Sequence, residues 1–174
     1  MSSTFSEQNV EDMVIHAVQK NGWEYVPASS LPRKESDVLV EAYLRDALIR
    51  LNPCIAENPA NADTVIYKLR ALISTVRPHD LVIQNERFKK LIFEENSFPF
   101  DKDGRSVSIK FFDYDDPANN RFVVTNQWVY PQAVGGKRLD IVLLINGFPV
   151  AIGEMKSPVR PSISWMDGAG DILN

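Results

Sequence analysis

Three charged residues stand in a largely apolar stretch of the sequence, LDIVLLINGFPVAIGEMK (139–156): Asp140, Glu154 and Lys156. Charged side chains in buried strands are costly unless they are paired or bind a metal ion. Two converging carboxylates suit Mg²⁺, a hard ion that prefers oxygen ligands and can activate a bound water. We therefore expect metal-assisted phosphodiester hydrolysis, with Asp140 and Glu154 as metal ligands and Lys156 positioning or activating the water. The alternative is a surface ion pair between Lys156 and one of the two acids, which would contribute at most about 1 kcal/mol.

The same stretch predicts two strands joined by a tight turn. Residues 139–145 and 150–155 are short, apolar and rich in branched side chains, as buried strands tend to be. Asn146-Gly147 between them is a strong hairpin signal, because both residues tolerate the positive φ that a tight turn needs.

The register of this hairpin decides whether the three charged residues can cooperate. A two-residue loop would place Asp140 opposite Gly153, and Glu154 would then point to the other face of the sheet. A three-residue loop over 146–148 would place Asp140 opposite Glu154, with Lys156 on the same face by the strand period. We expect the three-residue loop, in which the three charged side chains converge.

A first helix is predicted at the N-terminus. Thr4 fits the N-cap of a capping box with Glu7, apolar residues follow at helical spacing, and Asn21-Gly22 ends the helix. Glu11 falls at the edge of the apolar stripe, roughly 20° from Val18 by helical geometry. It could reach toward the hairpin as a third acidic group. The alternative is a carboxylate that faces solvent.

The remaining elements predict a mixed α/β fold: an N-terminal helix, a small sheet that contains the hairpin, and a helical insertion at about 34–96. Within the insertion we expect a loop at 53–62 between helices that span about Ser36 to Leu51, Asp63 to Arg77, and Asp80 to Glu95. Residues 105–174 should supply the sheet, the catalytic hairpin and a following helix. The strands expected before the hairpin are 107–111 and 122–129, and the final helix should begin at Ser162 or Ser164 and run through Asp171.

Two other groups of residues could contribute chemistry. Asp113, Asp115 and Asp116 could hold Ca²⁺, but they lack an EF-hand pattern, so we favour turn capping. Gln127 and Trp128 end a predicted strand and could approach the hairpin, although packing is the favoured role for Trp128.

Composition limits the class of protein. The chain has 174 residues, a formal net charge of −4 and one cysteine, Cys54, so an internal disulfide is excluded. An acidic chain is not expected to bind DNA strongly by itself, which would suit a nuclease delivered by partners. The sequence has no apolar run long enough for a membrane span, and its polar, acidic N-terminus is unlike a signal peptide. We expect a cytoplasmic protein.

The spacing of Asp140 from Glu154-x-Lys156 resembles the Asp…Glu-x-Lys signature of the PD-(D/E)xK nuclease superfamily. More specifically, RLDIVLLINGFPVAIGEMKSP is similar to the nuclease segment of type I restriction enzyme R subunits. The flanking runs DPANNRFVVTNQ (116–127) and WMDGAGDI (165–172) are similar to that family as well. Leu139 departs from the family by standing where a Pro usually precedes the Asp. The family's Gln-x-x-x-Tyr motif is not visible after the hairpin, and Asp171 lies near the position of its Gln.

The resemblance implies a PD-(D/E)xK core and Mg²⁺-dependent cleavage of double-stranded DNA. Glu11 matches the Glu that such nucleases place on their first helix, and it would assist Asp140, Glu154 and Lys156. The resemblance also implies modification and specificity subunits as partners, and an ATP-driven DNA-translocating motor in a further part of the polypeptide. A PD-(D/E)xK core would normally add a strand after the final helix, so we expect this sequence to be a fragment of a longer chain. No G-x-x-x-x-G-K-[ST] of the motor occurs in it.

Two alternatives stay open. The chain could be a docking module of the same complex without cleavage activity, which its acidic charge and the missing Gln-x-x-x-Tyr favour. It could also be a PD-(D/E)xK nuclease of another lineage that acts in repair or on RNA.

Overall fold

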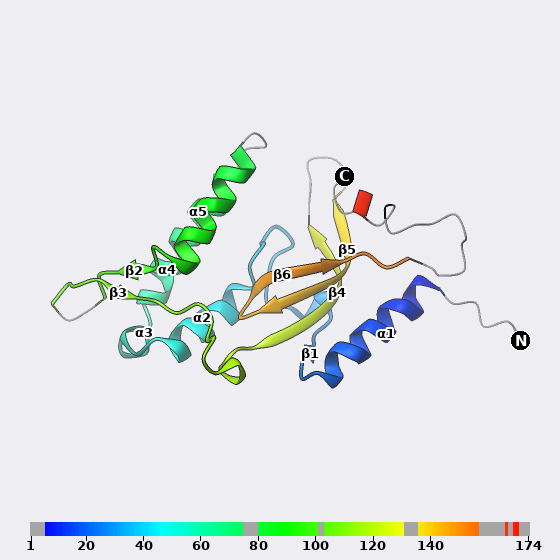
Figure 1. Cartoon of the computed structure of the whole chain (residues 1–174), viewed down its shortest axis with the longest axis horizontal. Coiled ribbons are helices and arrows are strands. Elements are labelled where there is room, and N and C mark those ends of the chain that lie inside the picture. The colour runs from blue at the N-terminus through cyan, green and yellow to red at the C-terminus, as the bar shows by residue number, and fades with distance from the viewer. Residues whose placement is uncertain are drawn as a thin grey trace, which may run out of the picture. The chain divides into compact units, whose positions relative to one another are not determined.

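The computed structural model describes residues 6–74, 80–100, 103–130, 136–156, 166 and 169–170. The chain divides into two compact units (Figure 1). The first unit combines Met1–Val40 with Arg121–Asn174, and the second is Glu41–Asn120. All of the predicted site residues belong to the first unit.

The first unit is built on a four-stranded sheet with the order β1-β4-β5-β6. Its strands are β1 (Glu24–Tyr25), β4 (Phe122–Tyr130), β5 (Lys137–Ile145) and β6 (Phe148–Gly153). β1 pairs with β4 in parallel, whereas the β4–β5 and β5–β6 pairs are antiparallel. The sheet is therefore mixed, and the prediction of a mixed α/β fold with a small mixed sheet is confirmed.

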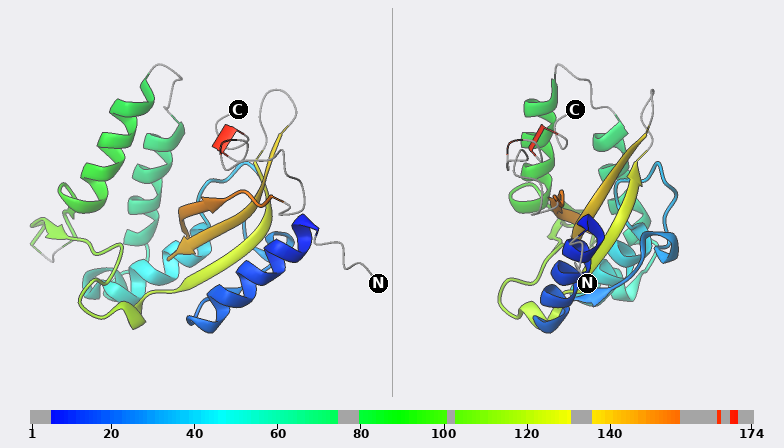
Figure 2. Two further views of the ribbon diagram at one scale, coloured as in Figure 1. Left: turned by 45° about the vertical axis from the view of Figure 1, so that its right-hand side comes forward. Right: turned by 90° about the vertical axis from the view of Figure 1, so that its right-hand side faces the viewer.

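Helix α1 (Glu7–Lys20) runs alongside β4 (Figure 2). Ile15 of the helix packs with Val124 of β4 and Ile141 of β5, and these three side chains are at most 5% exposed. Burying an aliphatic side chain of this size contributes about 1.5–3 kcal/mol. The core therefore fixes the helix against the two strands that precede the turn of the hairpin.

The cap of α1 differs from the prediction. Ser6, not Thr4, is the N-cap, and its side chain accepts a hydrogen bond from the backbone N–H of Asn9. The side chain of Asn9 accepts the reciprocal bond from the backbone N–H of Ser6, so Asn9 takes the part assigned to Glu7. A capping box is present, but it begins two residues later than expected because Asn as well as Glu can supply the returning acceptor.

Trp128 is a packing residue, as the sequence favours. It is 3% exposed, and the guanidinium carbon of Arg33 lies 3.6 Å from the centroid of its ring. Arg33 also donates to the backbone carbonyl of Val129. The Arg side chain thus covers the indole and ties the loop before Val40 to β4.

The second unit is mainly helical (Figure 1). Its helices and strands are α2 (Glu41–Leu51), α3 (Pro53–Glu57), α4 (Asn61–Ser74), α5 (Leu81–Phe93), β2 (Ser97–Phe98) and β3 (Val107–Ser108). Figure 2 shows α4 and α5 lying side by side, and α4 also packs against α2. Asn52, only 3% exposed, donates to the carbonyls of Leu48 and Lys110 and accepts from the N–H of Lys110, which closes the end of α2.

Three predictions for this unit are wrong in detail. The segment 53–62 contains the short helix α3, which Pro53 can begin because a proline is tolerated in the first turn. α2 begins at Glu41 rather than near Ser36. The strand expected over 107–111 is confined to β3, although Ile109 and Phe111 beyond it are buried as the alternating pattern requires.

The predicted helix from Ser162 or Ser164 to Asp171 lies largely outside the described residues. Within the described part of the chain, no helix combines the length and apolar character needed to cross a membrane.

Candidate functional site

The turn of the β5–β6 hairpin is a two-residue loop. Asn146 and Gly147 both have positive φ, at 50° and 85°, and Ile145 pairs directly with Phe148. The predicted three-residue loop is therefore wrong. Asn-Gly with positive φ at both positions is the signature of a type I′ turn, whose twist matches that of the flanking strands. Asn146 is also fixed in place, because its side chain accepts from the backbone N–H of Arg121 over 2.9 Å.

A β-bulge shifts the pairing of β5 with β6 by one residue from the register that a two-residue turn alone would give. Leu144 pairs with Pro149, but Leu143 pairs with Ala151, so Val150 is an extra residue on β6. The pairing then continues to Ile141 opposite Gly153.

The pairing of β5 with β6 ends there; continued by one step, the same register would set Glu154 across from Asp140. Directly opposed residues of antiparallel strands share a face of the sheet. A tight turn with a bulge thus gives the same register at the end of β6 that we expected from a longer loop. The bulge lies on an edge strand, where such irregularities are common.

Asp140 and Glu154 are half-buried, and each engages one oxygen within the hairpin. The backbone N–H of Met155 donates to Oδ2 of Asp140 over 2.8 Å. Nζ of Lys156 lies 3.0 Å from Oε1 of Glu154. The ion pair of the alternative interpretation is thus present, although its two side chains are only 25% and 14% exposed rather than at an open surface.

Glu11 lies on the inner face of α1 and is 4% exposed, so a solvent-facing carboxylate is excluded. Nε2 of Gln127 is 2.9 Å from both Oε1 and Oε2 of Glu11. A longer contact of 3.5 Å joins Nδ2 of Asn126 to Oε2. The hydrogen bonds of Glu11 thus go to β4 rather than to the hairpin.

The described residues include no group of three or more His, Cys, Asp or Glu side chains that could hold a metal ion together. Glu11 therefore does not complete a three-residue set with Asp140 and Glu154. The pairing of Asp140 with Glu154 as two metal ligands remains a prediction.

The acidic cluster before Pro117 caps a turn. Oδ1 of Asp113 accepts from the backbone N–H groups of Asp115 and Asp116, each over 3.1 Å, and its Oδ2 accepts from the side chain of Asn119 over 2.9 Å. The hydrogen bond from Asn119, together with those from the backbone, lowers the pKa of Asp113. The carboxylate is thus occupied by the turn, as the favoured interpretation predicts.

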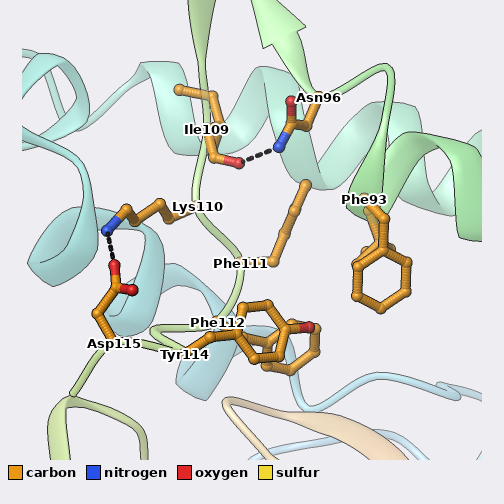
Figure 3. A pocket seen from close by; sticks show the side chains of 9 residues that line it. Phe93, Asn96, Ile109, Lys110, Phe111, Phe112, Tyr114 and Asp115 are labelled. Atoms are coloured by element: carbon orange, nitrogen blue, oxygen red, sulfur yellow. Dashed lines mark hydrogen bonds and ion pairs between the residues drawn. The ribbon is translucent and has the colours of Figure 1, made fainter. Parts of the chain in front are cut away.

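The second unit contains a cavity of about 220 Å³ (Figure 3). Phe93, Phe112 and Tyr114 contribute aromatic rings to its lining, and Lys110 and Asp115 form an ion pair beside them at 3.6 Å. Burial raises the pKa of Tyr114. None of the predicted site residues lines this cavity.

Two backbone features of this region have no signal in the sequence. No pattern marks Val150 as the bulged residue. Gln127 was expected only to approach the site, and its left-handed backbone, with φ of 54°, has no glycine or asparagine to signal it.

Comparison with known proteins places this chain in a family. The sequence model described as "Type I restriction enzyme R protein N terminus" matches residues 4–172. The chain is 32% identical over 168 residues to the type I restriction enzyme HindI endonuclease subunit of Haemophilus influenzae, covering 90% of this chain and 15% of that protein. It is 26% identical over 156 residues to a protein of Methanocaldococcus jannaschii named as the type I restriction enzyme MjaIXP endonuclease subunit, covering 86% of this chain and 15% of that protein. The chain thus spans about 15% of the length of these curated relatives.

Proposed function

The chain belongs to the family of type I restriction enzyme R protein N termini, and from this premise we propose that it is the endonuclease domain of such an R subunit. The proposed reaction is Mg²⁺-dependent hydrolysis of phosphodiester bonds in foreign double-stranded DNA, in the cytoplasm. In the whole protein, cutting would be coupled to ATP-driven translocation, and modification and specificity subunits would select the DNA. The observation that supports the proposal best is the bulged register, which pairs Ile141 with Gly153 and would, one step further, set Glu154 across from Asp140, with Lys156 in contact with Glu154.

The donor set fits a hard divalent cation. Asp140 and Glu154 offer carboxylate oxygens, the ligands that Mg²⁺ prefers. Oδ2 of Asp140 and Oε1 of Glu154 are engaged within the hairpin, whereas Oδ1 and Oε2 accept no hydrogen bond from any described residue. One oxygen of each carboxylate is thus available to an ion. The chemistry that bound Mg²⁺ supplies is polarisation of a phosphate oxygen and a lower pKa for a bound water.

Each residue of the chain then has a distinct part. The N–H of Met155 fixes the orientation of the Asp140 carboxylate, so this ligand is held before the substrate arrives. Contact with Glu154 holds the ammonium of Lys156 beside the same carboxylate pair. From there Lys156 can orient the attacking water and offset the negative charge that develops on the phosphoryl group. Glu11 would assist from α1, across β4.

Glu154→Gln tests the proposed metal site. An amide keeps the size of the side chain but removes its charge, so we expect half-maximal cutting to need an Mg²⁺ concentration about 10- to 100-fold higher. The measurement is cleavage of a DNA circle by the full-length protein with its partner subunits and ATP, over a series of Mg²⁺ concentrations. Glu57→Gln, at an exposed position in the second unit, is the matched control. An unchanged Mg²⁺ requirement in Glu154→Gln would count against the site.

A further inference from the structure

Two successive residues of β4 reach the same carboxylate. Asn126 and Gln127 both donate to Glu11 on α1, Gln127 at 2.9 Å to each oxygen. In a regular strand, successive side chains point to opposite faces of the sheet. One of these two residues must therefore depart from strand geometry.

The departure is at Gln127. Its φ of 54° lies in the left-handed region, which is uncommon for residues other than glycine, asparagine and aspartate. The ladder between β4 and β5 is interrupted at the same point: Asn126 pairs with Ile141 and Trp128 pairs with Leu139, but the position between them is unpaired. That position sets Gln127 across from Asp140.

Such a conformation is energetically unfavourable and persists only where the surroundings enforce it. Here it turns an amide toward the helix side of the sheet, where Glu11 is 4% exposed. A buried carboxylate needs donors, and Gln127 supplies its two shortest hydrogen bonds among the described residues. Tyr25 steadies the second donor, because its hydroxyl donates to Oδ1 of Asn126 over 2.9 Å.

We propose that Gln127 is a positioning residue, which fixes the orientation of the Glu11 carboxylate on α1 for the cleavage reaction. The inference rests on the proposed function, since it assigns Gln127 a part in that reaction. Gln127 acts through Glu11: the left-handed backbone aims the amide, and the amide orients the carboxylate. The left-handed backbone of Gln127 lowers the stability of the fold, but it places the amide where it can orient the Glu11 carboxylate.

Two substitutions separate positioning from a purely structural role. Gln127→Asn keeps an amide and tolerates the left-handed backbone better, but its side chain is one methylene too short for the same contact. Gln127→Gly removes the strain together with the amide. We expect both variants to cut DNA about 10- to 100-fold more slowly at a temperature well below their melting temperatures. Loss of two hydrogen bonds to a buried carboxylate lowers the melting temperature in either case, but a purely structural role would leave the cutting rate near the native rate wherever the variant is folded.

The assay uses the full-length protein with its partner subunits, ATP, Mg²⁺ and a DNA circle. ATP hydrolysis by the same complex reports that assembly is intact, and Gln19→Asn, an identical change at an exposed position of α1, is the matched control. Glu11→Gln should slow cutting as well. If Gln127 acts through Glu11, the double variant Glu11→Gln/Gln127→Asn cuts no more slowly than Glu11→Gln alone.

Native cutting rates in Gln127→Asn, or a double variant whose loss is the product of the two single losses, would overturn the positioning role. Asp140→Ala in the same assay separates this result from the proposed function. Cutting that survives Asp140→Ala refutes the nuclease site itself. Cutting that is lost in Asp140→Ala but retained in Gln127→Asn refutes the role of Gln127 alone.

Discussion

We expect that removing Val150 and Ala151 together abolishes the proposed DNA cleavage, whereas removing Val150 alone leaves it intact. Val150 is the extra residue of the bulge, so its deletion gives a regular ladder in which every other pair is kept and the register would still set Glu154 across from Asp140. Deleting both residues slides the rest of β6 by one position and sets Glu154 opposite Ile141. Since Ile141 belongs to the core that packs on α1, the carboxylate then faces away from Asp140.

We expect the double deletion to cut at less than about 10⁻³ of the native rate, because general acid–base groups and metal ligands together contribute at least that much. The measurement is cleavage by the assembled full-length complex, with ATP hydrolysis and the melting temperature followed in parallel. The single deletion is the matched control, since it shortens the same strand without moving the site. A double deletion that cuts as fast as the single one would show that the register does not place the catalytic groups.

We expect Lys156→Ala to lower the proposed cutting rate by about 10³-fold without a comparable change in ATP hydrolysis. The side chain is 25% exposed and lies against Glu154, so its ammonium is held near the proposed ligands rather than dispersed in solvent. Loss of one preorganised donor aimed at developing charge typically costs about 10²–10³-fold in rate. Removing the lysine also leaves Glu154 without its ion-pair partner, which adds to the loss.

Lys156→Arg distinguishes two possible roles of this residue: supplying positive charge, and placing or activating the attacking water. A guanidinium keeps the charge but is planar and effectively never loses its proton. Partial cutting by the Arg variant indicates that charge suffices, and cutting as slow as in Lys156→Ala indicates that the lysine must place or activate water. Lys89→Ala, at an exposed position of α5, is the control for loss of a lysine. Lys156→Ala cutting at the native rate would remove Lys156 from the mechanism.

Local sequence signals predicted much of the sheet and most of the helices. Asn146-Gly147 marks the turn because few other pairs adopt positive φ at both positions. The same pair is typical of a two-residue loop, so our prediction of a three-residue loop was one residue too long. The strand bounds followed from apolar patterning, and β4 spans Phe122–Tyr130 against a prediction of 122–129.

What the sequence could not supply depends on tertiary contacts. The bulge at Val150 is defined by the pairing of β6 with β5. No local conformational preference of Val, Pro or Ala predicts it. Glu11 sat at the edge of an apolar stripe on a helical projection, yet it is buried because β4 offers it two amides. The left-handed Gln127 is likewise imposed from outside, since glutamine has no intrinsic preference for that backbone.

The most direct test of the account is a structure of the protein with Mn²⁺, an ion that takes the same oxygen ligands as Mg²⁺ and can be located by its anomalous scattering. We predict one ion with an oxygen of Asp140 and an oxygen of Glu154 each about 2.0–2.6 Å away. Carboxylates of Asp140 and Glu154 on opposite faces of the sheet, or an ion bound to neither of them, would contradict the account.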